Sequence, residues 1–418
     1  MTTSCGVPPD HADSSYSALL TRAVEAESVK VVRFLIGRDD VEVNVESYEY
    51  NLNVPLGWKT PLLAAVSSGN AEMVRILLGH PRTDVNLRVH FRYTPIALAA
   101  SNGNVSVFRL LIQDPRVDPN RFGSSGENPL LNGARSGEIS IVRELLADPR
   151  VDVNVVSRDL ESAIHTAARY GHPHILRLLV EDGRIDVNAL SGCGCTPLEL
   201  AIKGFRSGES ADQAARECVR CILSHKSFDP STKNRWNGTA LQVAVSSTTP
   251  GISRILLAEG RFDAKAVNDA ALNLPFSPSP VKGKCLQGFL RDPRLDVNFR
   301  NSGGETILHC AARSDSLGMM WILLEDGRFD FNAINNCLET PLHVAARREQ
   351  GGLAWLLFMK RGGGGVDVAL KNCNGDTALD VAVKGGFQET TLVLRGHEPV
   401  HKDGIVQRVN EEICFEPM

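Results

Sequence analysis

A repeat of about 34 residues runs through most of this chain, and it constrains the fold more than any other feature of the sequence. A helix-opening string begins at Thr60-Pro61-Leu62 and returns at Thr94-Pro95-Ile96. An acidic residue in a recurring Asp-Val-Asn-like string keeps the same interval independently, with spacings of 34 between Asp84, Asp118, Asp152 and Asp186. Because the helix-opening string and the Asp-Val-Asn-like string recur at the same interval, we expect a solenoid in which each repeat packs on its neighbours.

The residues within one repeat predict two helices followed by a polar loop. Thr60 is a suitable N-cap, and Pro61 follows at the first helical position, where its missing N–H costs nothing. Gly69 then ends the first helix in a left-handed turn, and an apolar stripe begins at Met73 on the second helix. Asp-Pro-Arg or Asp-Gly-Arg strings, as at Asp114-Pro115-Arg116, end the second helix.

These features occur in the order found in the ankyrin-repeat family, which the chain resembles over residues 18–394. The resembling elements are the Thr-Pro-Leu-His opening, an alanine pair, a glycine, an apolar second helix and the Asp-Val-Asn string. The family period is commonly 33 residues, and one extra residue in the turn accounts for 34 here. The resemblance implies an all-α repeat solenoid of about eleven stacked helix-turn-helix repeats with hairpin-like finger loops.

The repeat register also predicts the organisation of the chain. We expect a disordered N-terminus over residues 1–16, repeats one to seven over 17–262, a degenerate eighth repeat over 263–299, repeats nine to eleven over 300–394, and a C-terminal tail over 395–418. The sixth repeat carries about nine extra residues between its helices, around 204–214. The eighth lacks the Thr-Pro start, and Pro275, Pro278 and Pro280 are expected to break its first helix.

Composition points to an intracellular protein, in the cytoplasm or the nucleus. The formal net charge of −4 gives no general attraction to nucleic acid. The N-terminus shows no secretory signal, no apolar run is long enough to span a bilayer, and the ten cysteines are scattered rather than spaced as a disulfide framework. We therefore expect a monomer that does not insert into membranes.

No catalytic, cofactor-binding or metal-binding motif stands out, so we expect a protein that is not an enzyme. Cys193 and Cys195, with Cys218 and Cys221, suggest a zinc site, but the repeat register places the second pair at core positions of a helix. The histidines at the Thr-Pro-Leu-His position have a scaffold role in the resembling family: His165, His309 and His343. A cryptic enzyme or effector in the irregular segments is the least favoured alternative.

The sequence thus favours an interaction module, an adaptor, scaffold or inhibitor that binds a protein partner through its concave face and finger loops. Aromatic and basic residues gather on the first two fingers, and these are the usual anchors of protein interfaces. The predicted contact residues there are Tyr48, Tyr50, Trp58, Arg88, His90, Arg92 and Tyr93. The alternative is that Trp58 and a tyrosine form a local cluster that orders the long first finger.

Two further features lie on the second helices of the repeats. Trp321 and Trp355 occupy equivalent positions in neighbouring repeats, which predicts either a contact site or packing against an unrecognised C-terminal element. The same position holds an arginine in seven repeats: Arg33, Arg75, Arg109, Arg143, Arg177, Arg220 and Arg254. This arginine ladder suggests an acidic partner or, as the alternative function, a nucleic-acid-associated regulator. Nucleic acid is nevertheless not the expected partner, because acidic residues in every turn are expected to neutralise the ladder and arginine stems cover apolar surface well.

Overall fold

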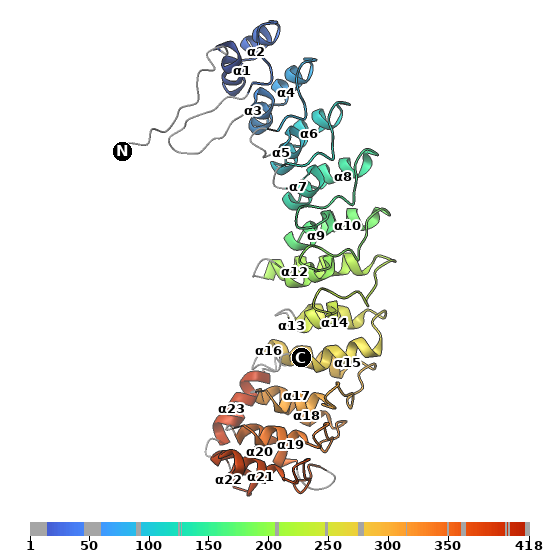
Figure 1. The fold of residues 1–418 in the computed structure, drawn as a ribbon, viewed down its shortest axis with the longest axis vertical. Coiled ribbons are helices and arrows are strands. Elements are labelled where there is room, and N and C mark those ends of the chain that lie inside the picture. The colour runs from blue at the N-terminus through green and yellow to red at the C-terminus, as the bar shows by residue number, and fades with distance from the viewer. Residues whose placement is uncertain are drawn as a thin grey trace, which may run out of the picture. The chain divides into compact units, whose positions relative to one another are not determined.

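The computed structural model describes residues 15–45, 60–88, 93–123, 126, 128–204, 209–246, 250–274, 280–314, 316–348, 351–360, 365–397, 399 and 402–413. Over these residues the chain forms 23 α-helices and no β-strand, apart from one isolated antiparallel bridge between Lys233 and Thr239. The first 22 helices make eleven pairs, as predicted (Figure 1). The expected N-terminal tail lies mostly outside the described residues.

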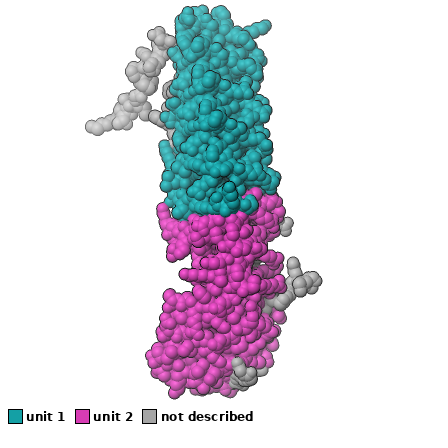
Figure 2. All heavy atoms as spheres, turned by 90° about the vertical axis from the view of Figure 1, so that its right-hand side faces the viewer, with its two compact units in different colours: residues 1–200, 204–206, 224–227 teal, residues 201–203, 207–223, 228–418 magenta. Residues whose placement is uncertain are grey.

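The chain divides into two compact units, coloured separately in Figure 2, and α11 (Pro197–Lys203) is shared between them. Unit 1 contains five helix pairs: α1 (Ser15–Glu25), α2 (Val29–Ile36), α3 (Pro61–Ser68), α4 (Ala71–Leu78), α5 (Pro95–Ser101), α6 (Val105–Ile112), α7 (Pro129–Ser136), α8 (Ile139–Ala147), α9 (Ala163–Tyr170) and α10 (Pro173–Glu181).

The remaining helices belong to unit 2. They are α12 (Glu209–Leu223), α13 (Ala240–Ser246), α14 (Pro250–Ala258), α15 (Ala264–Leu272), α16 (Pro280–Leu290), α17 (Ile307–Ala312), α18 (Leu317–Asp326), α19 (Pro341–Ala346), α20 (Gly351–Met359), α21 (Ala378–Gly385), α22 (Gln388–Leu394) and α23 (Lys402–Ile413). The last of these, α23, has no counterpart in the repeats.

The helix ends form as the sequence predicts. The Thr60 side chain accepts a hydrogen bond from the backbone N–H of Leu63, and Pro61 occupies the first helical position of α3. Gly69 ends this helix with a φ of 73°, a left-handed conformation that glycine adopts without steric cost. Within unit 1, first helices pack on first helices and second helices on second helices, which gives the two layers seen in Figure 1.

Asparagine side chains tie each finger to the next. Asn120 donates through Nδ2 to the carbonyl of Arg150 (2.6 Å) and accepts at Oδ1 from the backbone N–H of Asp152 (2.8 Å). Asn86 and Asn154 make the same two bonds one repeat earlier and one later. The Asp-Val-Asn-like string therefore recurs because it supplies one polar link per repeat.

Two irregular repeats of unit 2 keep their helices by different means. Residues 205–208 of the sixth insertion lie outside the described part of the chain, and α12 has 15 residues, against 8 or 9 in the second helices of unit 1. In the eighth repeat Asp263 caps α15 directly, accepting from the N–H of Ala266 (2.7 Å), so the finger loop is absent.

The eighth repeat also corrects one expectation about its prolines. They do not break the first helix, because α15 ends at Leu272, before Pro275, and Pro280 begins α16. Buried Asn268 of α15 accepts from the backbone N–H of Asp296 (2.8 Å), and so replaces the missing finger asparagine.

Candidate protein-binding surfaces

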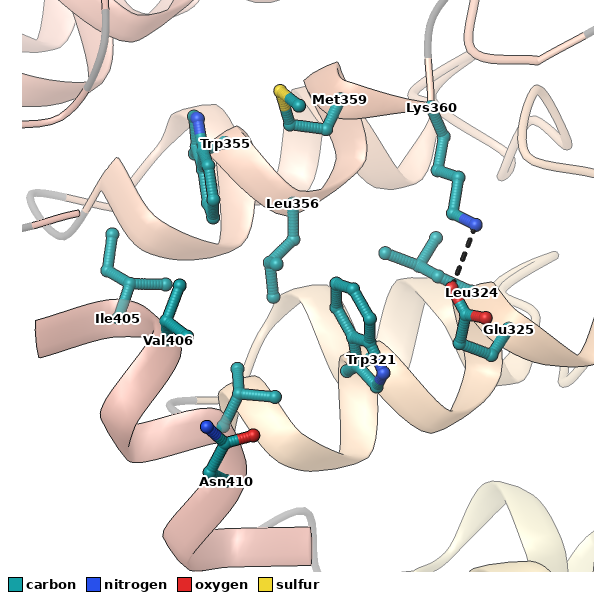
Figure 3. A pocket seen from close by; sticks show the side chains of 11 residues that line it. Trp321, Leu324, Glu325, Trp355, Leu356, Met359, Lys360, Ile405, Val406 and Asn410 are labelled. Carbon is teal, nitrogen blue, oxygen red and sulfur yellow. Dashed lines mark hydrogen bonds and ion pairs between the residues drawn. The ribbon is translucent and has the colours of Figure 1, made fainter. Parts of the chain in front are cut away.

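The two predicted tryptophans line one groove in unit 2, formed by α18, α20 and α23. Its volume is about 430 Å³. Figure 3 shows Trp321 and Leu356 pointing into the space between α18 and α20, and Trp355 pointing toward the start of α23. The complete lining is Trp321, Leu324, Glu325, Trp355, Leu356, Met359, Lys360, Ile405, Val406, Val409 and Asn410. Size and lining are those of a ligand- or side-chain-binding cleft.

Helix α23 forms one wall of this groove because one of its faces is buried. Ile405, Val409 and Glu412, spaced four and three residues apart, are all less than 9% exposed. The Glu412 carboxylate accepts from the Ser316 hydroxyl and from the backbone N–H of Gly318, both at 2.7 Å. These donors stand at the N-terminus of α18, where a negative charge is favourable.

Glycines on the second helices let α23 approach closely. A Cβ added at Gly318 would lie 2.5 Å from the Cβ of Glu412, and one at Gly352 would lie 3.0 Å from Leu317 and 3.5 Å from Ile405. An alanine at Gly318 would therefore force α23 away from α18.

Parts of the groove remain open to solvent. Met359 is 62% exposed, Val406 45% and Trp321 39%, whereas Trp355 is only 9% exposed. At the rim, Lys360 forms an ion pair with Glu325 (3.1 Å), drawn as a dashed line in Figure 3. An apolar hollow with exposed aromatic and methionine side chains and a charged rim has the make-up of a protein-contact site.

The structure bears on both interpretations of the tryptophan pair. It places the two rings beside an element of the C-terminal tail, and Trp355 is largely covered there. Trp321 keeps a substantial exposed area in the same groove. Trp355 therefore packs internally, whereas the contact role of Trp321 stays a prediction.

Two of the seven residues of the predicted finger patch belong to the described part of the chain. Tyr48, Tyr50, Trp58, His90 and Arg92 lie outside the described residues. Of the other two, Arg88 donates from Nη1 to the carbonyl of Phe122 in the next finger (2.9 Å), and Tyr93 is half-buried.

Sequence reasoning missed the residues that α23 brings to the groove, although one signal was present. Helix α20 reads Gly-Gly-Leu-Ala-Trp-Leu-Leu-Phe-Met and is apolar on all sides, and every residue from Gly351 to Phe358 is buried. A helix that is apolar all round is covered on more than one face. The composition of α20 thus implied a covering element.

The titratable groups of the scaffold take structural roles. His165 accepts at Nδ1 from the backbone N–H of Ser162 (3.3 Å), which leaves the proton on Nε2 to be donated to the carbonyl of Ala189 (3.0 Å). Burial lowers the pKa of His165, and likewise that of His309, which makes the same pair of bonds in its own repeat. Both residues therefore serve as neutral helix caps.

The four cysteines considered for zinc are mostly core residues. Cys195, Cys218 and Cys221 are buried, Cys193 is exposed, and burial raises the pKa of Cys218 to about 12. Among the described residues, no group of three or more His, Cys, Asp or Glu side chains is arranged to hold a metal ion. None of the described helices is both long and apolar enough to cross a membrane.

Comparison with known proteins identifies the repeat. The family described as "Ankyrin repeats (3 copies)" matches residues 62–157, 130–211 and 281–371. The human transient receptor potential cation channel subfamily A member 1 is 23% identical over 136 residues, which is 31% of this chain, and the chain spans about 11% of that channel's length. A crystal structure of EF0377, an ankyrin repeat protein, is 27% identical, with a TM-score of 0.43, and the match covers 47% of this chain and 95% of the other.

Proposed function

Because this chain belongs to the ankyrin-repeat family, whose members generally act as protein-interaction modules, we propose that it is an adaptor, scaffold or inhibitor that works by holding a protein partner. Proteins of this family are typically non-enzymatic, and we expect no catalytic activity of its own. Among the described surfaces, the groove between α18, α20 and α23 supports this function best.

An amphipathic helix of the partner fits the groove, with its apolar face against the groove. The neighbouring part of the same surface already holds such a helix, since α23 presents Ile405 and Val409 to α18 and α20. A second helix beside it would cover Trp321, Met359 and Val406, which are the exposed apolar side chains of the groove. Lys360 and Glu325 would lie at its edge, where polar residues of the partner face solvent.

A single substitution at the open edge tests this assignment. Met359 lies at the C-terminal end of α20, where a cation is favourable, so Met359→Lys is expected to leave folding intact. Leu338→Lys is the matched control, because Leu338 is 45% exposed and lies outside the groove. Proteins captured by the full chain would be identified, and the principal partner would then be purified and titrated against all three proteins.

We expect the partner's affinity to fall about 10-fold or more with Met359→Lys, equivalent to about 1.4 kcal/mol, and to stay unchanged with Leu338→Lys. Unchanged affinity with Met359→Lys would exclude the groove. A loss confined to Leu338→Lys would instead place the contact on the fingers.

A further inference from the structure

One arginine per repeat stands on the solvent side of the second helices of unit 1. These side chains occupy equivalent positions on consecutive helices, and all five are exposed: Arg33, Arg75, Arg109, Arg143 and Arg177. We call this set the unit 1 arginine row. Because each second helix packs on the next, the row continues through all five repeats of the unit.

The charges of this row are largely uncompensated. Only Arg109 is paired, through Nε to the Glu144 carboxylate of the next helix (2.5 Å). The other four form no hydrogen bond or ion pair with any residue that the structure describes. Across the five second helices there are six cationic side chains, the row and Lys30, against three acidic ones: Glu72, Glu144 and Glu181. We expected acidic residues in the turns to neutralise the row, but none of the described turn carboxylates forms an ion pair with an arginine of the row.

A second set of arginines shows where those acids are engaged. Arg150 in the turn after α8 bonds the Asp148 carboxylate (2.7 Å) and the carbonyls of Ile112 and Val117 in the preceding repeat. Arg116 and Arg184 make corresponding bonds in their repeats. The turn arginines thus brace the stack, whereas four of the five arginines in the row leave their guanidinium groups available to a partner.

From this geometry we propose that the unit 1 arginine row binds an extended acidic segment of a protein, with a carboxylate at every third residue, in the polyproline II conformation. Packed helices lie about 8–10 Å apart, which sets the interval between successive arginines. A polyproline II helix repeats every 3 residues and rises about 3.1 Å per residue, or about 9.3 Å per turn. Glutamates at every third position would therefore all face the row, one per arginine.

The competing geometries fit less well. In an extended β-strand, residues three apart point to opposite faces, so only every second carboxylate, one per six residues, would reach the row. In a DNA duplex each strand carries one phosphate per about 3.4 Å of helix axis, a much closer axial spacing than that of the arginines. The proposal concerns a different unit from the tryptophan groove and does not depend on it.

Two synthetic peptides of equal composition test the spacing directly. One contains five Glu-Pro-Pro triplets, and the other has its five glutamates in one block followed by the prolines. Binding of each to the full chain would be measured by calorimetry or fluorescence anisotropy at low and at physiological salt. We expect the triplet peptide to bind at least 10-fold more tightly, although the block peptide has the higher local charge density.

Charge variants locate the site. Arg75→Glu with Arg143→Glu is expected to weaken the triplet peptide about 10-fold or more, and Arg75→Gln with Arg143→Gln to weaken it less, without introducing repulsion. The control is Arg121→Glu with Arg158→Glu, which makes the same change in net charge on two exposed residues of the same unit outside the row. This control is expected to retain binding within about 2-fold.

Three outcomes would overturn the proposal. Equal affinity for both peptides would reduce the row to non-specific charge attraction. Equal weakening by the control variant would remove the row from the site. Tighter binding of a 15-nucleotide oligothymidylate than of the triplet peptide would indicate a nucleic-acid surface instead.

Discussion

Replacing Glu412 with alanine should release α23 from the second helices of unit 2. The Glu412 carboxylate accepts two hydrogen bonds at 2.7 Å, from the Ser316 hydroxyl and the Gly318 N–H, and the residue is 8% exposed. A hydrogen bond to a charged group contributes roughly 1.5–3 kcal/mol. Water would replace part of this once the carboxylate is gone, so we expect α23 to lose about 2 kcal/mol of its docking free energy.

Hydrogen exchange of the α23 amides measures this loss. At about 1.36 kcal/mol per factor of ten, 2 kcal/mol corresponds to exchange about 30-fold faster. Tryptophan fluorescence gives a second readout, because opening of α23 exposes Trp355 and widens the groove around Trp321. Exchange of α13, which has no part in the α23 interface, should stay unchanged.

The neighbouring glutamate supplies the control for this experiment. Glu411 is exposed and accepts a hydrogen bond from Nε2 of Gln407 within α23 (2.7 Å), so Glu411→Ala should change exchange about twofold at most. Glu412→Gln keeps an acceptor oxygen but loses the charge, and should fall between the two. If Glu412→Ala exchanges no faster than Glu411→Ala, the carboxylate does not hold α23 in place.

Three further predictions concern other parts of the chain. Because burial lowers the pKa of His165, the unfolded state binds more protons below pH 6.5, so the free energy of unfolding should fall as the pH drops from 6.5. His165→Asn should reduce this pH dependence in denaturant titrations, and an unchanged pH dependence would show that His165 does not cause it. In the eighth repeat, α15 packs on α16 and α17 less extensively than the first helices of unit 1 pack on the helices that follow them. The amides of α15 should therefore exchange fastest among the internal repeats, and protection equal to that of α5–α10 would contradict this. Tyr48→Ala with Tyr50→Ala, and Arg88→Glu with Arg92→Glu, should each change stability by only about 0.5 kcal/mol while weakening the principal partner about 10-fold; unchanged affinity with both pairs would exclude the fingers.

The repeat register predicted the scaffold because it acts through local chemistry. Thr60 caps its helix and Gly69 ends it through short-range rules that the sequence alone satisfies. These rules did not predict the start of the eighth repeat, because a different residue caps its first helix. Asp263 belongs to the Asp-Val-Asn-like string, which opens a finger in the regular repeats, but here it is the N-cap of α15. Such a change of N-cap is hard to predict from the sequence, because the Asp and the Thr that can cap a first helix stand at different positions of the repeat.

The groove could not be predicted in the same way, because its third wall is made by a segment that follows no repeat. Among the described side chains of α23, Ile405, Val409 and Glu412 are buried against the stack, which is too short a pattern to distinguish from a solvated tail. The second helices of the repeats carry a clearer signal of this contact in their own sequence. Three residues before the arginine position, the repeats of unit 1 carry a polar residue that is exposed, as at Glu72, Ser106 and Ser140. The repeats under α23 carry buried glycines there, Gly318 and Gly352.

This contrast has a physical basis that extends beyond α23. A repeat constrains the residues buried between neighbouring helices and leaves the outward positions free, so an outward position that turns to glycine or tryptophan indicates something seated on it. At Gly318 and Gly352 the seated element is α23. At Trp321, which stays 39% exposed beside it, no described part of the chain completes the cover, and the same reasoning therefore points to an occupant from another molecule.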